Sequence, residues 1–529
     1  MHDTGWNRIA RIEELKEGIP ISVKLDKAEI FVVLTGGSVY AMEGKCSHYG
    51  GPLREGLINE KAVTCPWHNA RFDITTGKMT APPALKDLRR FPVKVENGDV
   101  YLGPPEAASI PGAGKSTESD GRVFAIVGGG AAGNAAAEML RHEGFPGRIL
   151  LITAERRLPY DRPLLSKDFL SGEADPDWVP LHNRKFYEKL GIEILSDRRV
   201  RQLKPKERVL VFSNGQEIQF DQALLATGGI PRRISIPGGD LPNVFLLRSM
   251  DDAESIVKGV ETAEKAVVLG ASFIGLEVAA SLRKRGLEVD LVAPEEIPMK
   301  KVFGDRIGRW FQQMHEREGV RFHLGRTVER IEQKGESLRA RLSDGSDLEA
   351  NVIVGGLGVD PAIEYLAGTD LVQKGAVPVD QRLQTRAPGI FAAGDIAVFP
   401  DRRSGEMQRI EHWVVAEAQG QHAARAMLGS DIPYDEIPFF WTRQYGRSIK
   451  YLGHASSFDK VAYRSSVEEK SFFAGYYQQG RLKAAASLGG GNEFVALGEL
   501  LKAGIPPSVE SFENVGLSFI DTIRKLNER

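Results

Sequence analysis

Two cysteines and two histidines stand at short spacings near the start of the chain. They read Cys46-Ser-His48 and Cys65-Pro-Trp-His68, and 16 residues separate the two pairs. Thiolate and imidazole groups are common ligands of transition metals. Because each pair is short enough to come from one tight loop, two such loops could hold one inorganic centre between them.

Three kinds of site could use these four residues. Structural zinc sites usually begin with two cysteines and end with two histidines, whereas here the two residue types alternate. A buried core without metal is the simplest alternative. A two-iron cluster with thiolates on one iron and imidazoles on the other takes one ligand of each type from each loop, as in Rieske centres. We therefore predict that Cys46, His48, Cys65 and His68 bind a [2Fe–2S] cluster. We expect His68 at an exposed loop tip, where electrons would enter or leave.

Cys46 and Cys65 are the only cysteines among 529 residues, and they lie 19 positions apart. Two cysteines are too few for a disulfide scaffold. A dithiol oxidoreductase would need them close together, usually as C-x-x-C. Both of these roles are therefore excluded.

Short alternating apolar stretches surround the two pairs. Examples are "IFVVLTGGSVYAM", "KAVTCPW" and "FPVKVENGDVYL", with turn residues between them. This pattern predicts an all-β domain over residues 1–103. The next stretch, 104–121, is rich in Pro, Gly and Ser, and it predicts a flexible linker.

A glycine turn follows the apolar strand that begins near Arg122. It reads Gly128-Gly-Gly130-Ala131-Ala132-Gly133, and an alanine-rich helix comes next. Such a turn brings its backbone and the helix N-terminus close to a pyrophosphate. Glu155 lies 22 residues past Gly133, at the spacing of a ribose-binding acid. This segment therefore predicts a dinucleotide site.

A second strand, turn and helix begin near residue 265. The turn reads Gly270-Ala-Ser272-Phe273-Ile274-Gly275, with Ser272 in place of the middle glycine. Two such units predict two α/β nucleotide-binding domains. The acid after the next strand is displaced to Glu295, and no Arg lies between residues 286 and 305. Because NADPH usually needs Arg near its 2′-phosphate, NADH is favoured and NADPH is the alternative.

The stretch "CSHYGGPLREG…CPWHNARFDITTGK" closely resembles Rieske-type ferredoxins and the Rieske domains of oxygenase systems, over about residues 7–103. The additional loop cysteines of respiratory Rieske proteins are missing here. This departure favours the low-potential, ferredoxin-like branch.

"LPYDRPLLSK" (158–167), "LLATGG" (224–229) and "GIFAAGDIA" (389–397) resemble the FAD-dependent pyridine nucleotide-disulfide reductase superfamily, over about residues 122–529. The resemblance implies that Arg162 and Lys167 lie along the flavin, and that Asp395 bonds its ribityl chain. It implies that Phe273 shields the nicotinamide, with core packing as the alternative, and that Glu277 pairs with Lys167. The other residues implied at the two cofactors are Thr227, Gly228, Gly358, Gly394 and Trp413.

The redox disulfide of that superfamily is absent, because "RPLLSKDFL" contains no cysteine. "IEHWVVAEAQGQHAA" (410–424) and "FFWTRQYG" (439–446) instead resemble the branch of ferredoxin, rubredoxin and putidaredoxin reductases and apoptosis-inducing-factor-like proteins. The resemblance thus implies hydride transfer from NAD(P)H to FAD, followed by single electrons to the cluster.

Composition excludes several other classes. The formal net charge is −2 and no polybasic block is present, so nucleic acid is not an expected partner. The first residues lack an apolar stretch typical of a secretory signal, and no run approaches the length of a membrane span. We therefore expect a cytoplasmic protein without a membrane span.

The full prediction is a multidomain chain with an all-β Rieske domain, two α/β dinucleotide domains and an α+β C-terminal domain. The expected limits are 1–103 for the Rieske domain, 122–240 and 358–432 for the FAD domain, 241–357 for the NAD(P) domain and 433–529 for the C-terminal domain. The expected partners are NAD(P)H and an electron-acceptor protein such as an oxygenase, and a homodimer is considered. The alternative function is an NADH-responsive redox sensor of the apoptosis-inducing-factor-like type.

Overall fold

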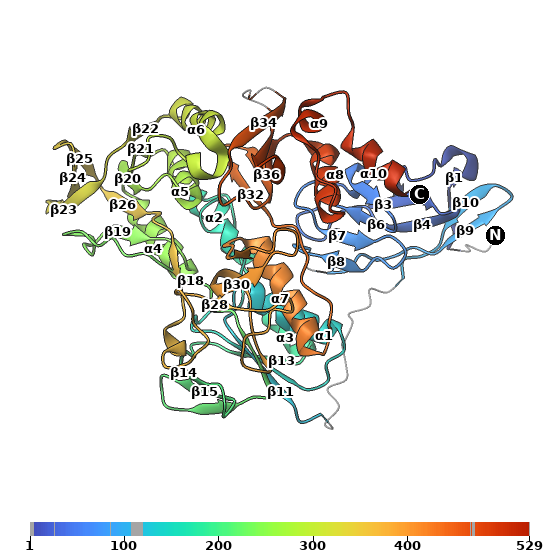
Figure 1. Cartoon of the computed structure of the whole chain (residues 1–529), viewed down its shortest axis with the longest axis horizontal. Helices are drawn as coiled ribbons and strands as arrows, with labels where there is room; N and C mark the ends of the chain where they lie inside the picture. Colours follow the sequence, from blue (N-terminus) through green and yellow to red (C-terminus); the bar gives the residue numbers. More distant parts are fainter. Residues whose placement is uncertain are drawn as a thin grey trace.

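A computed structural model gives the fold, and it describes residues 5–25, 27–84, 86–106, 120–465, 467 and 471–527. The N-terminal strands, the two α/β domains and the C-terminal elements form separate parts of the molecule (Figure 1). Most of the predicted linker, residues 107–119, lies outside the described residues. No helix in the described ranges is both long enough and apolar enough to cross a membrane.

The N-terminal domain consists of antiparallel sheets, as the alternating pattern predicted. One sheet has the order β1-β10-β9, a second β2-β3-β4 and a third β5-β6-β7-β8. Buried Phe31, Val33 and Phe72 share its core. The strands are β1 (Asn7–Arg11), β2 (Ile21–Leu25), β3 (Ala28–Thr35), β4 (Ser38–Glu43), β5 (Leu57–Asn59), β6 (Ala62–Thr64), β7 (Arg71–Asp73), β8 (Met79–Ala81), β9 (Val93–Glu96) and β10 (Asp99–Leu102).

The first α/β domain is built on a five-stranded parallel sheet of order β13-β12-β11-β17-β29. Its strands read as continuous apolar runs because both faces of a parallel sheet are covered. The sheet strands and main helices are β11 (Val123–Val127), α1 (Ala131–His142), β12 (Arg148–Ile152), β13 (Ile192–Leu195), β17 (Gln222–Leu225), β29 (Ile390–Ala392) and α7 (Trp413–Met427). The jump from β17 to β29 shows that another domain is inserted between them.

The inserted domain has its own five-stranded parallel sheet, of order β19-β26-β20-β21-β22. Its strands and helices are β19 (Val244–Leu246), α4 (Met250–Val260), β20 (Lys265–Leu269), α5 (Phe273–Lys284), β21 (Glu288–Ala293), α6 (Lys300–Arg317), β22 (Val320–Leu324) and β26 (Val352–Gly355). A small antiparallel sheet packs beside it, formed by β23 (Val328–Lys334), β24 (Ser337–Leu342) and β25 (Asp347–Ala350).

Smaller elements complete the two α/β domains. A two-stranded ribbon pairs the entry to the inserted domain with its exit, and it consists of β18 (Gly229–Pro231) and β27 (Val359–Pro361). The others are α2 (Asp168–Ser171), α3 (Arg184–Lys189), β14 (Val200–Lys204), β15 (Val209–Phe212), β16 (Glu217–Gln219), β28 (Val377–Pro378), β30 (Ala397–Pro400) and β31 (Met407–Gln408).

The C-terminal domain is a five-stranded antiparallel sheet of order β32-β33-β36-β35-β34, with three helices after it. Its elements are β32 (Phe439–Gln444), β33 (Arg447–Gly453), β34 (Lys460–Ser465), β35 (Phe472–Gln478), β36 (Arg481–Leu488), α8 (Gly491–Lys502), α9 (Val509–Glu513) and α10 (Phe519–Asn527). The predicted fold class is confirmed. The predicted domain limits stay predictions.

The N-terminal domain packs against the C-terminal domain (Figure 1). Leu57 of β5 joins the hydrophobic core beneath α8 and α10. Glu499 of α8 accepts hydrogen bonds from Asn59 at 2.7 Å and Arg71 at 3.1 Å. The N-terminal domain is therefore held against the C-terminal domain by apolar packing and by hydrogen bonds.

Candidate functional site

A cavity of about 1080 Å³ lies where the two α/β domains and the C-terminal domain meet. Both glycine turns open into it. Among the predicted cofactor-binding residues, those that line the cavity are Gly128, Gly130, Ala131, Ala132, Glu155, Arg162, Lys167, Thr227, Gly228, Ser272, Phe273, Ile274, Glu277, Gly358, Gly394, Asp395 and Trp413. The cavity thus brings together residues predicted for two different cofactors.

The first glycine turn has three glycines with three different surroundings. Gly128 has φ +121° and its added Cβ would lie 2.0 Å from the Ala226 carbonyl oxygen. Gly133 lies behind the cavity wall, and its Cβ would lie 1.8 Å from the Gly128 oxygen. Gly130 precedes α1, and its Cβ would meet nothing within 4 Å. The open space at Gly130, beside the helix N-terminus, fits a pyrophosphate.

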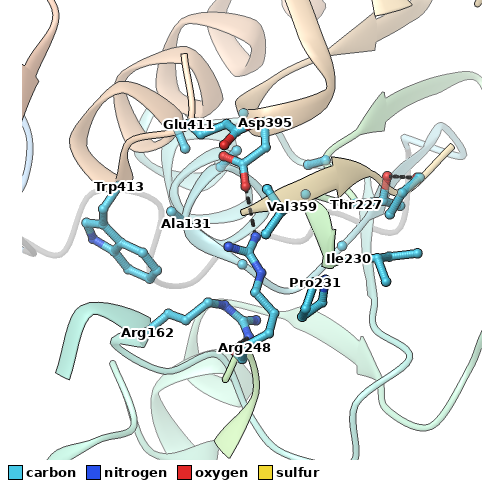
Figure 2. A pocket seen from close by; sticks show the side chains of 18 of the residues that line it. Ala131, Arg162, Thr227, Ile230, Pro231, Arg248, Val359, Asp395, Glu411 and Trp413 are labelled. Carbon is cyan, nitrogen blue, oxygen red and sulfur yellow. Dashed lines mark hydrogen bonds and ion pairs between the residues drawn. The ribbon is translucent and has the colours of Figure 1, made fainter. Parts of the chain in front are cut away.

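Charged side chains fix one wall of the cavity. Arg162 donates to Glu155 at 2.8 Å and to the Tyr160 hydroxyl at 2.9 Å. Arg248 extends toward Asp395 and pairs with it at 2.8 Å (Figure 2). Sequence reasoning missed Arg248, because it lies 147 positions from Asp395 and belongs to no motif. Glu155 and Asp395 are thus held in place by arginines, and their roles toward the cofactor stay predictions.

Lys167 and Glu277 both line the cavity and form an ion pair at 2.9 Å. Glu277 also accepts hydrogen bonds from Ser166 at 2.5 Å and from Thr442 at 2.6 Å. Its side chain is only 4% exposed. A buried carboxylate is stable when it is paired and fully hydrogen-bonded. Glu277 meets that condition with three donors from two segments of the chain, residues 166–167 and β32.

The second glycine turn uses its serine as a helix cap. The Ser272 hydroxyl accepts a hydrogen bond from the Gly275 N–H at 3.3 Å and donates to the Gly356 oxygen at 2.8 Å. A serine at this position stabilises the start of α5. Gly270 and Gly275 lie behind the wall, where a Cβ on Gly275 would come within 2.0 Å of the Gly270 oxygen. The serine therefore preserves the turn that the missing glycine would have formed.

Phe273 and Glu295 differ in how they relate to the cavity. Phe273 lines it, and its ring contacts Phe440 edge-on at 4.9 Å. Both expected roles of Phe273, shielding a ligand and packing in a core, are therefore compatible with its place. Glu295 is exposed after β21 and does not line the cavity. Its predicted contact with the cofactor stays a prediction.

The two pairs of Cys and His lie in neighbouring loops, one between β4 and β5 and the other between β6 and β7. We call them the first and second ligand loops, residues 46–50 and 65–69. The Nδ1 atoms of His48 and His68 lie 3.1 Å apart. The thiols of Cys46 and Cys65 are buried and contact each other. Imidazoles thus gather with imidazoles and thiols with thiols.

This donor set fits a [2Fe–2S] cluster. Burial lowers the pKa of His48 to about 4 and that of His68 to about 3, so both imidazoles are neutral and can bind metal. A hydrogen bond with Cys46 lowers the pKa of Cys65 to about 7. In the part of the chain that the structure describes, no three His, Cys, Asp or Glu residues converge on one metal ion. Two ligands per iron is the arrangement of a Rieske centre.

The structure corrects the expected position of His68. Its imidazole is partly buried and faces Trp441 of β32, with ring centroids 4.2 Å apart. His48 lies 5.9 Å from the same ring. Trp441 also lines the cavity. The expectation of an exposed tip was wrong because the packing of one domain against another cannot be read from the loop itself.

Family models match the chain in three successive parts. The Rieske [2Fe-2S] domain matches residues 5–92, the pyridine nucleotide-disulphide oxidoreductase model matches 123–420, and the reductase C-terminal model matches 439–518. The second of these covers more than half of the chain. The chain belongs to the pyridine nucleotide-disulphide oxidoreductase family. It is a flavoprotein oxidoreductase that uses FAD, NAD(P)H and a [2Fe–2S] cluster.

Relatives of this oxidoreductase cover most of its length. Apoptosis-inducing factor 3 of Homo sapiens is 35% identical over 497 residues, which are 91% of this chain and 81% of the relative. The ferredoxin–NAD(+) reductase component of the biphenyl dioxygenase system of Paraburkholderia xenovorans is 30% identical over 402 residues, or 76% of this chain and 98% of the relative.

Solved structures also resemble the oxidoreductase. The ferredoxin reductase for the CYP199A2 system from Rhodopseudomonas palustris has a TM-score of 0.72 at 34% identity, covering 76% of this chain and 99% of the other. The covalent putidaredoxin reductase–putidaredoxin complex has a TM-score of 0.73 at 27% identity, covering 77% and 99%.

The oxidoreductase departs from the disulfide branch of its family in one respect. Its two cysteines both lie in the ligand loops, so no dithiol is available beside the cavity. The aromatic residue Trp441 stands between the cavity and His68 instead. The arrangement therefore favours transfer toward the cluster.

Proposed function

We propose that this chain oxidises NADH, transfers the electrons through its FAD to its own Rieske cluster, and delivers them to an acceptor protein such as an oxygenase. The observation that carries the proposal is the contact between His68 and Trp441 at the cavity wall. FAD supplies the step from two-electron to one-electron chemistry, which no side chain provides. The residues of the chain supply binding, orientation and exclusion of water.

The predicted roles of the side chains follow from their surroundings. The turn at Gly128, Gly130 and Gly133 would hold the FAD pyrophosphate, and the turn at Ser272 would hold that of NADH. Lys167, with Glu277 as its counter-ion, would place a fixed positive charge at the flavin ring. Because this pair is buried, its electrostatic effect is larger than it would be in water.

The proposed acceptor rests on the relatives. Several are reductase components of dioxygenase systems, among them that of the biphenyl dioxygenase system. Described residues contain no three-ligand metal site of their own for oxygen chemistry, so the oxygenase would be a separate chain. NADH specificity, cytoplasmic location and a homodimer stay predictions.

A redox-responsive interaction protein is the second candidate. The observation that favours it is the match to Apoptosis-inducing factor 3, which extends over 91% of this chain and so includes the Rieske part. Fast steady-state reduction of a one-electron acceptor such as ferricyanide would favour the enzyme. A long-lived complex of reduced protein and NAD⁺ that reacts slowly with such acceptors would favour the sensor.

Anaerobic titration with NADH tests the main proposal. Flavin absorbance reports the first step, and the electron paramagnetic resonance signal of a reduced Rieske cluster reports the second. We expect both to develop with NADH as the sole reductant. If the flavin is reduced but the cluster stays oxidised at excess NADH, the internal transfer step is wrong.

A further inference from the structure

Tyr49 links the first ligand loop to the FAD domain. It directly follows His48, and their ring centroids lie 4.0 Å apart. Its hydroxyl donates a hydrogen bond to Oδ2 of Asp161, 112 positions further along the chain.

The hydrogen bond from Tyr49 satisfies one of the two carboxylate oxygens of Asp161. Its side chain is buried, and its other oxygen, Oδ1, has no hydrogen-bond partner. Burial raises the pKa of Asp161, while the bond from Tyr49 and the charge of Lys167 lower it. Leaving a buried carboxylate without its donor is costly, so the contact with Tyr49 is part of what stabilises Asp161 in place.

Asp161 also belongs to the segment that lines the cavity. Its neighbours Arg162 and Pro163 and the nearby Lys167 are cavity residues. The Asp161 N–H donates to the Val179 oxygen at 2.8 Å, which fixes the segment from the other side. The hydrogen bond from Tyr49 therefore joins a cluster loop to the segment that holds the flavin.

The second ligand loop has a separate contact. Lys450 of β33 donates from Nζ to the carbonyl oxygen of Pro66, between Cys65 and His68. Lys450 pairs with Trp441 across neighbouring antiparallel strands, and residues paired in this way point to the same face of a sheet. One cross-strand pair thus contacts the second loop twice, through an ammonium group and through a ring.

We propose that Tyr49–Asp161 and Lys450–Pro66 form a two-point clamp that positions the cluster loops against the flavin cavity. Each ligand loop has one contact of the clamp, and the two contacts lie on different domains of the reductase. Two separated contacts fix orientation as well as distance, which one contact would not. This role deepens the proposed function and rests on it, and all four residues are positioning residues.

The test uses the full chain loaded with both cofactors, in anaerobic stopped flow with NADH. Flavin and cluster reduction are followed separately in the same reaction. Tyr49→Phe and Asp161→Leu are expected to slow cluster reduction by about tenfold, the factor to which loss of one charge-assisted hydrogen bond corresponds. In Tyr49→Phe, which changes a residue outside the segment that lines the cavity, the rate of flavin reduction and the KM for NADH are expected to stay within about twofold of the unmodified protein.

Two further variants separate positioning from general damage. Asp161→Asn keeps an oxygen that accepts the same hydrogen bond, so it should retain most of the rate. Tyr101→Phe in β10 removes a hydroxyl from the same domain but keeps the ring that contacts Lys94, so it should behave like the unmodified protein. The double variant of Tyr49→Phe and Asp161→Leu should be no slower than the slower single variant.

Hydrogen exchange of the same variants gives a second measurement. Amides of the first ligand loop should exchange faster in Tyr49→Phe and Asp161→Leu, and not in Asp161→Asn. If Tyr49→Phe lost its cluster, the Asp161 variants would decide, because they lie outside the ligand loops. Cluster reduction at the normal rate in Asp161→Leu, or additive losses in the double variant, would overturn the clamp. An unmodified protein whose cluster is not reduced by NADH would instead overturn the proposed function.

Discussion

Trp441 and His68 face each other across the boundary between the C-terminal and Rieske domains, with ring centroids 4.2 Å apart and planes inclined by 40°. Trp441 comes from β32 and also lines the cavity between the two α/β domains. One side chain therefore contacts a predicted cluster ligand and the space predicted for the flavin. This contact brings the Rieske domain against a residue of the cavity wall.

Removing the Trp441 ring should slow electron transfer to the cluster. Trp441→Ala takes away the contact that sets the position of His68, and misplacement of about 1 Å near a reacting centre costs roughly 100-fold in rate. We expect cluster reduction to slow by about 10–100-fold, and Trp441→Phe to keep most of the rate. Trp178→Phe, at an exposed position outside the ligand loops, is the matched control. Equal rates in Trp441→Ala and the control would show that the contact is dispensable.

Truncation of Glu277 should destabilise the junction between the two α/β domains. Glu277→Ala leaves Lys167 buried without its counter-ion, and breaking a buried pair costs about 3–5 kcal/mol. Glu277→Gln keeps an oxygen for Ser166 or Thr442 and should cost less. The temperature at which flavin fluorescence appears on heating reports the loss. Glu288→Gln, an exposed carboxylate in β21, should leave that temperature unchanged.

Glu417 of α7 predicts a pH dependence of stability. Burial, followed by the charge of Asp161, raises its pKa well above the ordinary value. A hydrogen bond from Trp413 opposes that shift and Glu138 adds to it. Because the folded protein then binds a proton that the unfolded chain releases, stability falls as pH rises from about 4.5 toward the folded pKa, by up to about 1.4 kcal/mol per pH unit.

Glu417→Gln removes this dependence. The variant should gain stability over the unmodified protein at pH 8, and the gain should be small at pH 5. Melting temperatures of both proteins across that range test it. Glu188→Gln, at an exposed position of α3, should follow the unmodified protein at every pH. A difference between Glu417→Gln and the unmodified protein that stays constant with pH would mean that Glu417 is ionised in the folded protein.

Substitutions in the two glycine turns should affect different cofactors, the first turn FAD and the second turn NADH. A Cβ at Gly133 would lie 1.8 Å from the Gly128 oxygen, and one at Gly275 would lie 2.0 Å from the Gly270 oxygen. Gly133→Ala should yield protein without bound FAD. Gly275→Ala should retain FAD that dithionite reduces normally, while its reduction by NADH slows by more than about tenfold. Gly121→Ala, where a Cβ meets nothing within 4 Å, is the control. Loss of FAD in Gly275→Ala would contradict the assignment of the turns.

The parts that were predictable from sequence are local ones. Each predicted cluster pair and each glycine turn spans fewer than seven residues, so its geometry depends mostly on its own residue types. Alternation in the first hundred residues and apolar strands after residue 122 were enough to predict the fold class.

The contacts that join these parts were not predictable. Arg248 pairs with Asp395, Thr442 with Glu277 and Tyr49 with Asp161, at separations of 147, 165 and 112 positions. No periodicity or spacing connects residues so far apart. The expected exposure of His68 failed for the same reason, since Trp441 lies in a domain that begins more than 350 residues later.

The sequence by itself determined which chemistry is present: two thiols and two imidazoles in alternating order, two glycine turns, and no dithiol for the flavin. Those features depend on residue type and short spacing, which the chain carries directly. Only the tertiary structure decided where that chemistry meets. The ligand loops lie at the cavity wall because Leu57 packs into the C-terminal core and because hydrogen bonds form at Glu499, Asp161 and Pro66. Burial and charge pairing of this kind depend on distance in space and not on distance along the chain.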